Sequence, residues 1–249
     1  MDVMAHVAEL RRNGDLLATA AAEAGPDAPV PPCPDWNVRD LVHHLGGVHR
    51  WATSFVDGRT DPQGAGLDEI VGTWPGDDEL VGWFLEGCEA LAASLASAPA
   101  DLDCWTFLPA PTPLAMWARR QDHEAAIHRV DAELAAGLPS EGFSTDMAAD
   151  GVDELLVCFV GRRRGPPPGG AGRTLAVSAT DAGQEWLLTF GPEQIDVTSG
   201  SGRADCTLSG AAADLYLALW NRRGLDGIAA DGDLEVVGLL DERLRIRWS

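Results

Sequence analysis

The stretch PLAMWARRQDHEAAIHRVDAELAAGLP, residues 113–139, decides how the first half of the chain folds. Prolines interrupt the chain just before it, and the tripeptide GLP at its end is a common stop signal for a helix. Between these signals, apolar residues such as Ile127 and Val130 recur at helical spacing. The stretch therefore predicts one long helix that runs from Pro113 to Ala136.

Three further helices are expected before this one. Apolar residues recur at helical spacing over residues 3–23, 37–56 and 77–98. In the second of these stretches, Asn37 is the expected N-cap, and Asp40 completes a capping-box-like pair three residues later. Four long helices with short connections are typical of an antiparallel four-helix bundle, which we expect in the first part of the chain.

The second part of the chain has a different character. One more helix is expected over residues 145–163, and the run GRRRGPPPGGAGR after it has no periodicity, which is typical of a surface loop. The remaining runs are strand-like TLAVSA, EWLLTF, QIDVTS and RADCTLS, helical GAAADLYLALWNRR, and then DLEVVG and LRIRW. This order predicts a smaller α/β or α+β domain. We therefore expect an α+β protein with a helical domain over residues 1–140 and a small C-terminal domain over residues 141–249.

Composition narrows the class of protein and of partner. The chain has 249 residues, of which 45% are apolar, and a net charge of -21. A field of that sign repels phosphate backbones, so we expect no nucleic-acid partner. All 18 basic residues are arginine, a bias typical of a GC-rich bacterial genome such as an actinobacterial one.

The sequence also indicates where in the cell the protein is located. We see no secretory signal, and nothing that approaches the roughly 20 apolar residues of a membrane span. The five cysteines are dispersed with no C-x-x-C, which indicates reduced thiols in a cytoplasm. The sequence therefore predicts a cytoplasmic protein without a membrane partner.

The segment DHEAAIH, residues 122–128, carries the first candidate for chemistry. Residues four apart share one face of a helix, so Glu124 and His128 can reach one ion, whereas His123 points about a quarter turn from Glu124. The pair borders the apolar stripe, where a carboxylate and an imidazole need a partner. Two interpretations stay open, half of a metal site and a polar patch on an ordinary helix.

A third ligand is available on the second helix, in HHLGGVH. By helical angle, His43 faces away from the apolar stripe, His44 lies at its margin and His49 lies inside it. The angles alone slightly favour His49 as a ligand. The alternative is that His49 is a hydrogen-bonded core residue and that His43 and His44 face solvent. Two histidines and one carboxylate would leave open coordination positions, which is typical of a catalytic zinc site.

Two segments resemble the mycothiol-dependent maleylpyruvate isomerase family: PCPDWNVRDLVHHLGGVHRWA and HEAAIHRVDAE. The resemblance implies a DinB-like four-helix bundle followed by a sterol-carrier-like C-terminal domain, whose pattern the stretch ADCTLSGAAADLYLALWNRR resembles. Carried over to this sequence, the zinc ligands of the family are His44, Glu124 and His128. The resemblance thus overrides the angular preference for His49.

Three more residues are candidates for the site. His49 becomes a candidate residue of the cofactor pocket, or one that contacts a metal-binding side chain. Asp131 either orients His128 or forms a surface salt bridge with an arginine such as Arg129 or Arg120. In the family, an arginine of the C-terminal domain helps to bind substrate; Arg222, as the catalytic candidate, or its neighbour Arg223 is the counterpart. Both arginines fit equally well as helix-ending cations.

The resemblance implies an enzyme that uses zinc, or another divalent metal, and mycothiol as thiol cosubstrate. Its reaction would be isomerisation of a small molecule or thiol transfer to an electrophile. None of the five cysteines falls in the metal-ligand motifs, which suits an external thiol. Two alternatives remain: a metal-binding protein with another hydrolytic or transfer activity, and a non-catalytic metal- or ligand-binding or regulatory module. A monomer and a homodimer are both compatible with the sequence.

Overall fold

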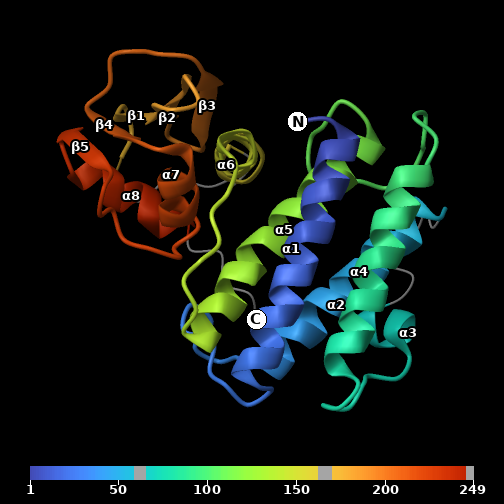
Figure 1. Ribbon diagram of the computed structural model, residues 1–249. Coiled ribbons are helices and arrows are strands. Elements are labelled where there is room, and N and C mark those ends of the chain that lie inside the picture. Colours follow the sequence, from blue (N-terminus) through green and yellow to red (C-terminus); the bar gives the residue numbers. More distant parts are fainter. Residues whose placement is uncertain (59–65, 162–169, 245–249) are drawn as a thin grey trace. The chain divides into compact units, whose positions relative to one another are not determined.

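The computed structural model describes residues 1–58, 66–161 and 170–244. The chain divides into two compact units, Met1–Glu141 and Gly142–Ser249 (Figure 1). The first is helical and the second contains a mixed sheet, so the predicted α+β class is confirmed.

The first unit is built from four long helices and one short one. They are α1 (Val3–Ala24), α2 (Val38–Val56), α3 (Leu67–Val71), α4 (Leu80–Ser97) and α5 (Pro113–Ala136). The expected helix from Pro113 to Ala136 is confirmed at both ends. Each of the four long helices was predicted to within a few residues.

The helices form two parallel pairs, α1/α5 and α2/α4. In the α2/α4 pair, Gly46 faces Trp83 and Arg50 faces Gly87, so residue numbers rise together along both helices. Helix α1 packs against α4 and α5, and α2 packs against the same two helices (Figure 1). The expected antiparallel arrangement therefore holds between the pairs and not within them.

The contact between α2 and α5 illustrates the antiparallel packing. His44 contacts Glu124, whereas Trp51, farther along α2, contacts Trp117, which lies earlier on α5. The residue numbers of the two helices therefore run in opposite directions along this interface.

Two connections cross the bundle diagonally. Helices α1 and α2 lie diagonally across the bundle, as do α4 and α5, and make few contacts with each other. Residues 25–37 and residues 98–112 bridge these diagonals. A bundle with diagonal crossings needs long connections, and the first of them brings its residues next to the site described below.

Local chemistry sets the helix ends. The capping box of α2 is confirmed: the amide of Asp40 donates to Asn37 Oδ1 and the amide of Asn37 donates to Asp40 Oδ2, each at 3.0 Å. Thr112 caps the start of α5 through its hydroxyl. Gly137 ends α5 at a φ of 68°, a left-handed conformation that glycine adopts without strain.

Helix α4 is apolar for a helix of this length. Its 18 residues reach a mean hydropathy of 1.2, so among the described residues it alone is long and apolar enough to span a membrane by length and composition. This corrects the expectation that nothing approaches a span. In the bundle the helix packs against α1 and α2 and buries Phe84, Leu91 and Leu95, as a core helix does.

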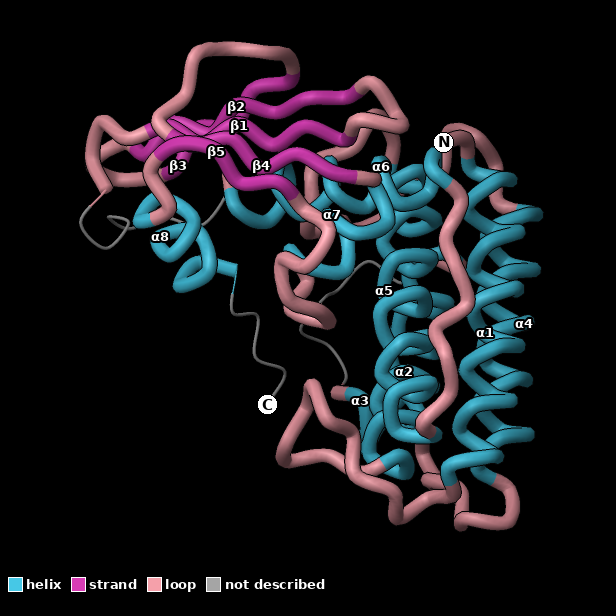
Figure 2. The backbone as a smooth tube through the Cα atoms, turned by 60° about the vertical axis from the view of Figure 1, so that its left-hand side comes forward, coloured by secondary structure: helices cyan, strands magenta, loops and turns pink. Residues whose placement is uncertain are grey.

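The second unit is a five-stranded sheet with helices on one face (Figure 2). The strands are β1 (Thr174–Ala179), β2 (Gln184–Phe190), β3 (Ile195–Ser199), β4 (Cys206–Gly210) and β5 (Ala229–Gly232), in the order β3-β2-β1-β4-β5. Strands β1 and β4 are parallel and the other neighbours are antiparallel. The helical segments are α6 (Thr145–Asp153), the π-helix η1 (Glu154–Val160), α7 (Ala212–Leu219) and α8 (Glu235–Leu244).

The four strand-like runs and the helical run of the sequence lie on β1 to β4 and α7. The run DLEVVG is different, because most of it belongs to helix α8. Val236 and Leu240, four residues apart, are both buried there, and that spacing is helical. Most of the GRRRGPPPGGAGR and LRIRW segments lies outside the described residues.

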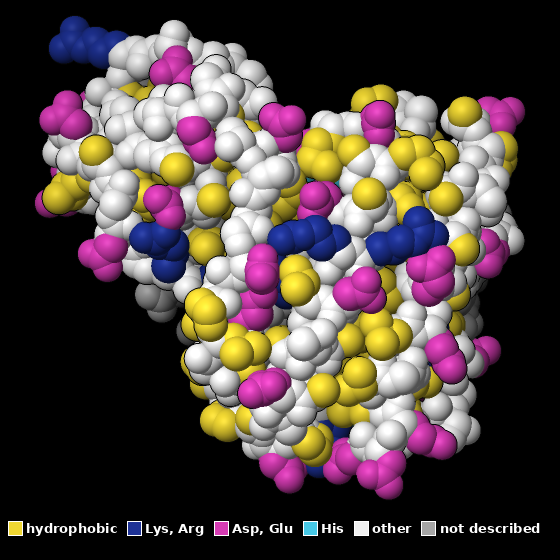
Figure 3. Space-filling view, viewed as in Figure 1, with side chains coloured by type: hydrophobic (Ala, Val, Ile, Leu, Met, Phe, Trp, Pro, Cys, Tyr) yellow, Lys and Arg dark blue, Asp and Glu magenta, His cyan; other side chains and the backbone are white. Residues whose placement is uncertain are grey.

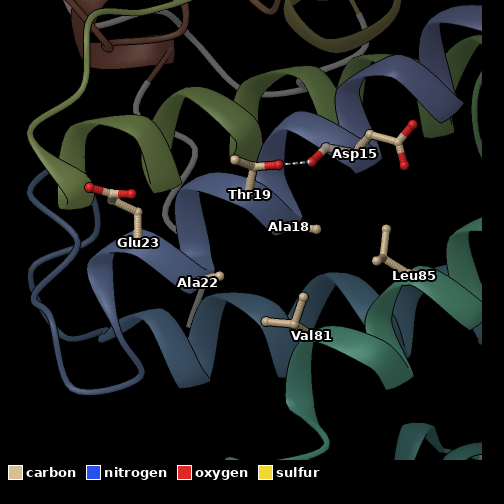
Figure 4. A pocket seen from close by; sticks show the side chains of 7 residues that line it. All are labelled: Asp15, Ala18, Thr19, Ala22, Glu23, Val81 and Leu85. Atoms are coloured by element: carbon tan, nitrogen blue, oxygen red, sulfur yellow. Dashed lines mark hydrogen bonds between the residues drawn. The ribbon is translucent and has the colours of Figure 1, made fainter.

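The chain carries a net charge of -21. On the face that Figure 3 shows, acidic side chains are scattered among apolar ones and the arginines are few. A shallow groove of about 700 Å³ lies between α1 and α4 (Figure 4). It is lined by Asp15, Ala18, Thr19, Ala22, Glu23, Val81 and Leu85. The groove lies between α1 and α4, whereas the polar cluster described next lies between α2 and α5.

Candidate metal centre

Three side chains meet between α2 and α5 of the bundle. His44 Nε2 lies 3.5 Å from Glu124 Oε1, and His128 Nε2 lies 3.4 Å from the same oxygen. One donor atom from each of the three side chains lies within 4.8 Å of the others. Glu124 and His128 are buried, whereas the His44 side chain is 20% exposed. The three donors therefore converge on one point at the edge of the helical core.

A fourth side chain holds the carboxylate. Arg120 Nη2 donates to Glu124 Oε2 at 2.8 Å from one turn earlier on α5. Burial acts to raise the pKa of Glu124, but the charge of Arg120 and the hydrogen bonds from His128 and His44 outweigh it. The pKa of Glu124 falls well below its usual range. The carboxylate is therefore ionised, with Oε2 held by the guanidinium and Oε1 presented to both imidazoles.

Asp131 orients one of the histidines. Its Oδ2 lies 2.9 Å from His128 Nδ1. Burial acts to lower the pKa of His128, and Asp131 and Glu124 together raise it above its ordinary value. Asp131 is fully buried, so it is not the surface salt bridge that the sequence left open. A carboxylate on Nδ1 leaves Nε2 directed at the cluster, an arrangement common for histidines that bind metals.

The connection between α1 and α2 contributes two further residues. The Trp36 ring packs on His44 at 4.8 Å and on His128 at 6.0 Å between ring centroids. Cys33 Sγ lies 4.0 Å from Asp131 Oδ2, at hydrogen-bond distance for sulfur. This segment therefore packs against both candidate histidines and against Asp131.

The donor set fits a divalent metal. Two imidazole nitrogens and one carboxylate oxygen form a three-ligand set typical of catalytic zinc, which keeps a position open for an exchangeable ligand. We therefore treat His44, Glu124 and His128 as the candidate ligands.

Comparison with protein families decides where the chain belongs. The family model of the mycothiol maleylpyruvate isomerase N-terminal domain matches residues 7–133, and that of the MDMPI C-terminal domain matches residues 146–239. The chain belongs to the mycothiol maleylpyruvate isomerase family. The family expected from the two N-terminal segments, and with it an enzyme, is thereby confirmed.

Solved structures agree at the level of the fold. The chain superimposes on a crystal structure of the mycothiol-dependent maleylpyruvate isomerase with a TM-score of 0.62, 13% identity and 93% coverage of each chain. A crystal structure of a His-to-Ala mutant of that isomerase matches with the same figures. No curated protein matches the chain in sequence. An identity of 13% supports a shared fold with the isomerase and no finer correspondence.

The other two histidines of α2 differ from the ligand candidate. His49 is fully buried against Phe84, with 5.4 Å between ring centroids, and neither of its ring nitrogens has a hydrogen-bond partner among the described residues. It thus lies in the apolar stripe, as its helical angle predicted, but without the hydrogen bond that a core histidine was expected to make. Burial lowers the pKa of His49 to about 3, so it is neutral.

His43 does not face solvent, which corrects the sequence-based alternative. Its Nε2 lies 3.2 Å from the Pro75 carbonyl, and its ring packs on Trp74 and Trp83. The helical angle placed it correctly away from the apolar stripe. The loop before α4 covers that side of α2, which the angle alone does not reveal.

Arg222 and Arg223 each make contacts with residues close to them in sequence. Arg222 Nη1 donates to the Trp220 carbonyl at 2.8 Å just after α7. Arg223 forms an ion pair with Asp214 and also donates to the Asp226 carbonyl. The part assigned to Arg222 in this family member therefore stays a prediction.

Sequence reasoning missed the contacts of three residues at the cluster, Arg120, Trp36 and Cys33. Arg120 carried a signal, because it stands four residues before Glu124 and opposite charges at that spacing attract on a helix. Trp36 carried a weaker one, since it lies next to the N-cap of α2 in the segment that resembles the family. No disulfide joins the five cysteines, all of which lie in the described residues.

Proposed function

We propose that this chain is a zinc-dependent enzyme that uses mycothiol to isomerise a small cis-unsaturated keto acid of the maleylpyruvate type. The observation that carries the proposal is the convergence of His44 Nε2, His128 Nε2 and Glu124 Oε1 within 4.8 Å of one another. The donor set favours zinc among divalent metals, because histidine suits zinc and an open position suits catalysis.

The chain prepares these donors before any ion arrives. Asp131 sets the His128 tautomer so that the Nε2 lone pair faces the centre. Arg120 neutralises part of the Glu124 charge and holds Oε2, which leaves Oε1 for coordination. His44 is the most exposed of the three side chains, so a thiol would approach the centre from its side.

The metal would supply acidity for a thiol. When bound, a divalent metal at this centre lowers the pKa of a thiol in its open position, so the thiol reacts as thiolate near neutral pH. Addition of thiolate to the double bond of the substrate would form a C–S bond and move the electron pair of the double bond into the conjugated ketone as an enolate, which leaves a C–C single bond that rotates. Loss of the same thiolate restores the double bond in the trans form, so no thiol is consumed.

The remaining parts of the proposal follow from the family. Mycothiol is the thiol cosubstrate, Arg222 is the proposed cation for a substrate carboxylate, and His49 borders the metal pocket without being a ligand. Thiol transfer to an electrophile is the related reaction that the same centre would support. A cytoplasmic location and a monomeric or homodimeric state remain predictions from sequence.

Two measurements test the proposal. Elemental analysis of chelator-washed protein should find about one zinc per chain, as a three-ligand site predicts. The zinc-loaded protein should convert maleylpyruvate to its trans isomer only when mycothiol is present. If the protein holds zinc and transfers the thiol but does not isomerise maleylpyruvate, the metal centre would stand and the proposed reaction would be thiol transfer. Absence of zinc would contradict the proposal and leave a non-catalytic module.

A further inference from the structure

Five aromatic rings gather at one end of the α2/α5 interface. Phe55 and Trp117 stack at 5.3 Å with an interplanar angle of 11°, and both are fully buried. Trp51, Trp105 and Phe107 lie on them with centroid distances of 5.2 to 6.3 Å within the cluster and are only half-buried. We call these three half-buried rings the aromatic shelf. The two buried rings anchor it to the core.

The shelf is in register with the metal centre. Trp51 stands seven residues after His44 on α2, and Trp117 stands seven residues before Glu124 on α5. Seven residues are almost two full turns, so each tryptophan lies on the same face of its helix as the corresponding ligand, about 10 Å along the axis. Because α2 and α5 run antiparallel, both steps lead in the same direction. The Trp51 and Trp117 rings meet at 5.3 Å, as His44 and Glu124 meet at the other end.

A partly exposed aromatic shelf has a chemical preference. Planar rings attract other planar, apolar groups in stacked or edge-to-face contact, worth about 0.5–1.5 kcal/mol per pair beyond area burial. A small dicarboxylate has no group that uses such a surface. The net charge of -21 adds no attraction for a second carboxylate.

We infer that the aromatic shelf binds an aromatic group of the electrophilic substrate while the reacting double bond lies at the metal centre. The inference rests on the proposed function of that centre and names its substrate class. The substrate is a cis-unsaturated ketone or keto acid with an aryl group within about 10 Å of the reacting carbon, the distance set by the two-turn register.

A matched pair of compounds tests the inference. The first is maleylpyruvate, and the second is its analogue in which a phenyl ring on a short alkyl chain replaces the carboxylate on the double bond, so that the ring can reach the shelf two helical turns away. The saturated form of the phenyl analogue cannot react and serves as a binding probe. Calorimetry with this probe, without thiol, measures the shelf independently of turnover and of the thiol site.

Two substitutions address the shelf and one serves as control. Trp105→Leu retains the backbone carbonyl that accepts from Trp117 Nε1, and Phe107→Leu retains an apolar side chain. Trp74→Leu removes a half-buried tryptophan that packs on His43, outside the shelf. Zinc content and thermal melting of each variant show whether the centre and the fold persist.

The expected result is specific to the aryl compounds. Trp105→Leu and Phe107→Leu should each weaken binding of the saturated phenyl probe by about tenfold, the upper range of one aromatic contact. They should also lower kcat/KM for the phenyl substrate and leave zinc content, KM for mycothiol and kcat/KM for maleylpyruvate unchanged. Trp74→Leu should change none of these.

Three outcomes would overturn the inference. Equal losses for both substrates would make the shelf structural, and unchanged probe binding in the shelf variants would remove it as a subsite. A rise confined to the KM for mycothiol would assign the shelf to the thiol. If the wild-type protein holds zinc, binds the phenyl probe through the shelf and turns over neither substrate, the proposed reaction fails while the subsite stands.

Discussion

Helix α2 makes two interfaces that contain the same kinds of residue and use them differently. Toward α4, His43 contacts the Pro75 carbonyl, and Arg50 donates to the carbonyls of Gly46 and Trp83 at 3.1 and 2.8 Å. Toward α5, His44 contacts the side chains of Glu124 and His128. Each interface has a histidine packed on tryptophan, yet the α4 side directs these polar groups at the backbone. The α5 side instead gathers side-chain donors around a point.

The difference teaches how a metal-binding histidine is distinguished from a structural one. His43 and His44 are neighbours in sequence, so composition and local propensity cannot separate them. What separates them is the partner, a backbone carbonyl for His43 and a carboxylate shared with a second imidazole for His44. A carbonyl completes the hydrogen bonding of a neutral imidazole, whereas a shared carboxylate retains capacity for an ion.

The largest effect on zinc content should appear when each of the two neighbouring histidines is replaced by alanine in a separate variant. His44→Ala should abolish stoichiometric zinc, because two remaining donors do not hold the ion at a three-ligand site. His43→Ala should keep the zinc and lose about 1 kcal/mol of unfolding free energy through its lost hydrogen bond and packing. Metal analysis and chemical denaturation of both variants measure the contrast.

His128→Ala is the second arm of that experiment and should match His44→Ala in metal content. Zinc retained in both variants would contradict the assignment of the metal to the α5 side. Zinc lost in His43→Ala, while that variant remains folded, would assign the metal to the α4 side.

A smaller effect on the same side should follow from Asp131→Asn. The change removes the charge that orients the His128 ring and leaves a side chain of the same shape. Loss of such a supporting partner commonly costs 10–100-fold in metal affinity, and we expect a loss within about that range here. Competition with a chromophoric chelator measures the affinity.

The matched control for this change is Asp122→Asn. Asp122 is also buried on α5 and lies 2.9 Å from His6 Nδ1, away from the candidate ligands. It should leave zinc affinity unchanged. An equal loss in both variants would mean that general damage to α5, and not His128 orientation, controls binding.

Much of the fold could be predicted because its signals are local. The proline-to-glycine limits of α5 and the Asn37–Asp40 capping box depend on residues close in sequence, and both were correct. The diagonal crossings of the bundle depend on which helix faces pack together, a long-range property without a local signal. Helix α8 was missed for a related reason, because a short apolar run suits either period.

The site divides in the same way. Glu124 and His128 share one helical face, so their proximity follows from the sequence alone. The choice between His44 and His49 did not follow, since the helical angles placed His44 at the margin of the apolar stripe and slightly favoured His49, and only the family resemblance favoured His44. The position of His49 against Phe84 of α4 is a tertiary fact. The cover over His43 likewise comes from residues more than 30 positions away.

The α4 side can be disturbed without touching the centre. A side chain at Gly46 would collide with the Trp83 ring, which also carries the Arg50 guanidinium at 3.8 Å from its centroid. Gly46→Ala should therefore lower the unfolding free energy by about 1–3 kcal/mol, the range of overpacked cores, with zinc content unchanged. Denaturant unfolding of the zinc-loaded protein provides the measurement.

Gly82→Ala is the control for this substitution. Gly82 is an exposed residue of the same α4 helix with open space where a methyl group would point, so alanine should stabilise the helix by about 0.5–1 kcal/mol. Destabilisation by both alanines would show that α4 rejects any change, and the close packing at Gly46 would lose its significance.

The last test concerns the third histidine of α2, which lies toward α4. The pKa of His49 falls from its ordinary 6.5 to about 3, first because it is buried. A lowered histidine pKa means that protonation favours the unfolded chain. Its contribution to stability is complete above pH 6.5 and is lost as the pH falls toward 3. Between pH 7 and 5 the unfolding free energy should fall by about 2 kcal/mol through this group.

His49→Leu isolates that contribution, because leucine fills the apolar site beside Phe84 without a titrating group. Both proteins are unfolded by denaturant after removal of metal, so loss of zinc at low pH does not enter. The wild-type protein should lose about 2 kcal/mol more than the variant between pH 7 and 5. If the unfolding free energy of both proteins changes equally with pH, His49 is hydrated or protonated in the folded protein. His49 would then resemble the polar residues of the α5 interface.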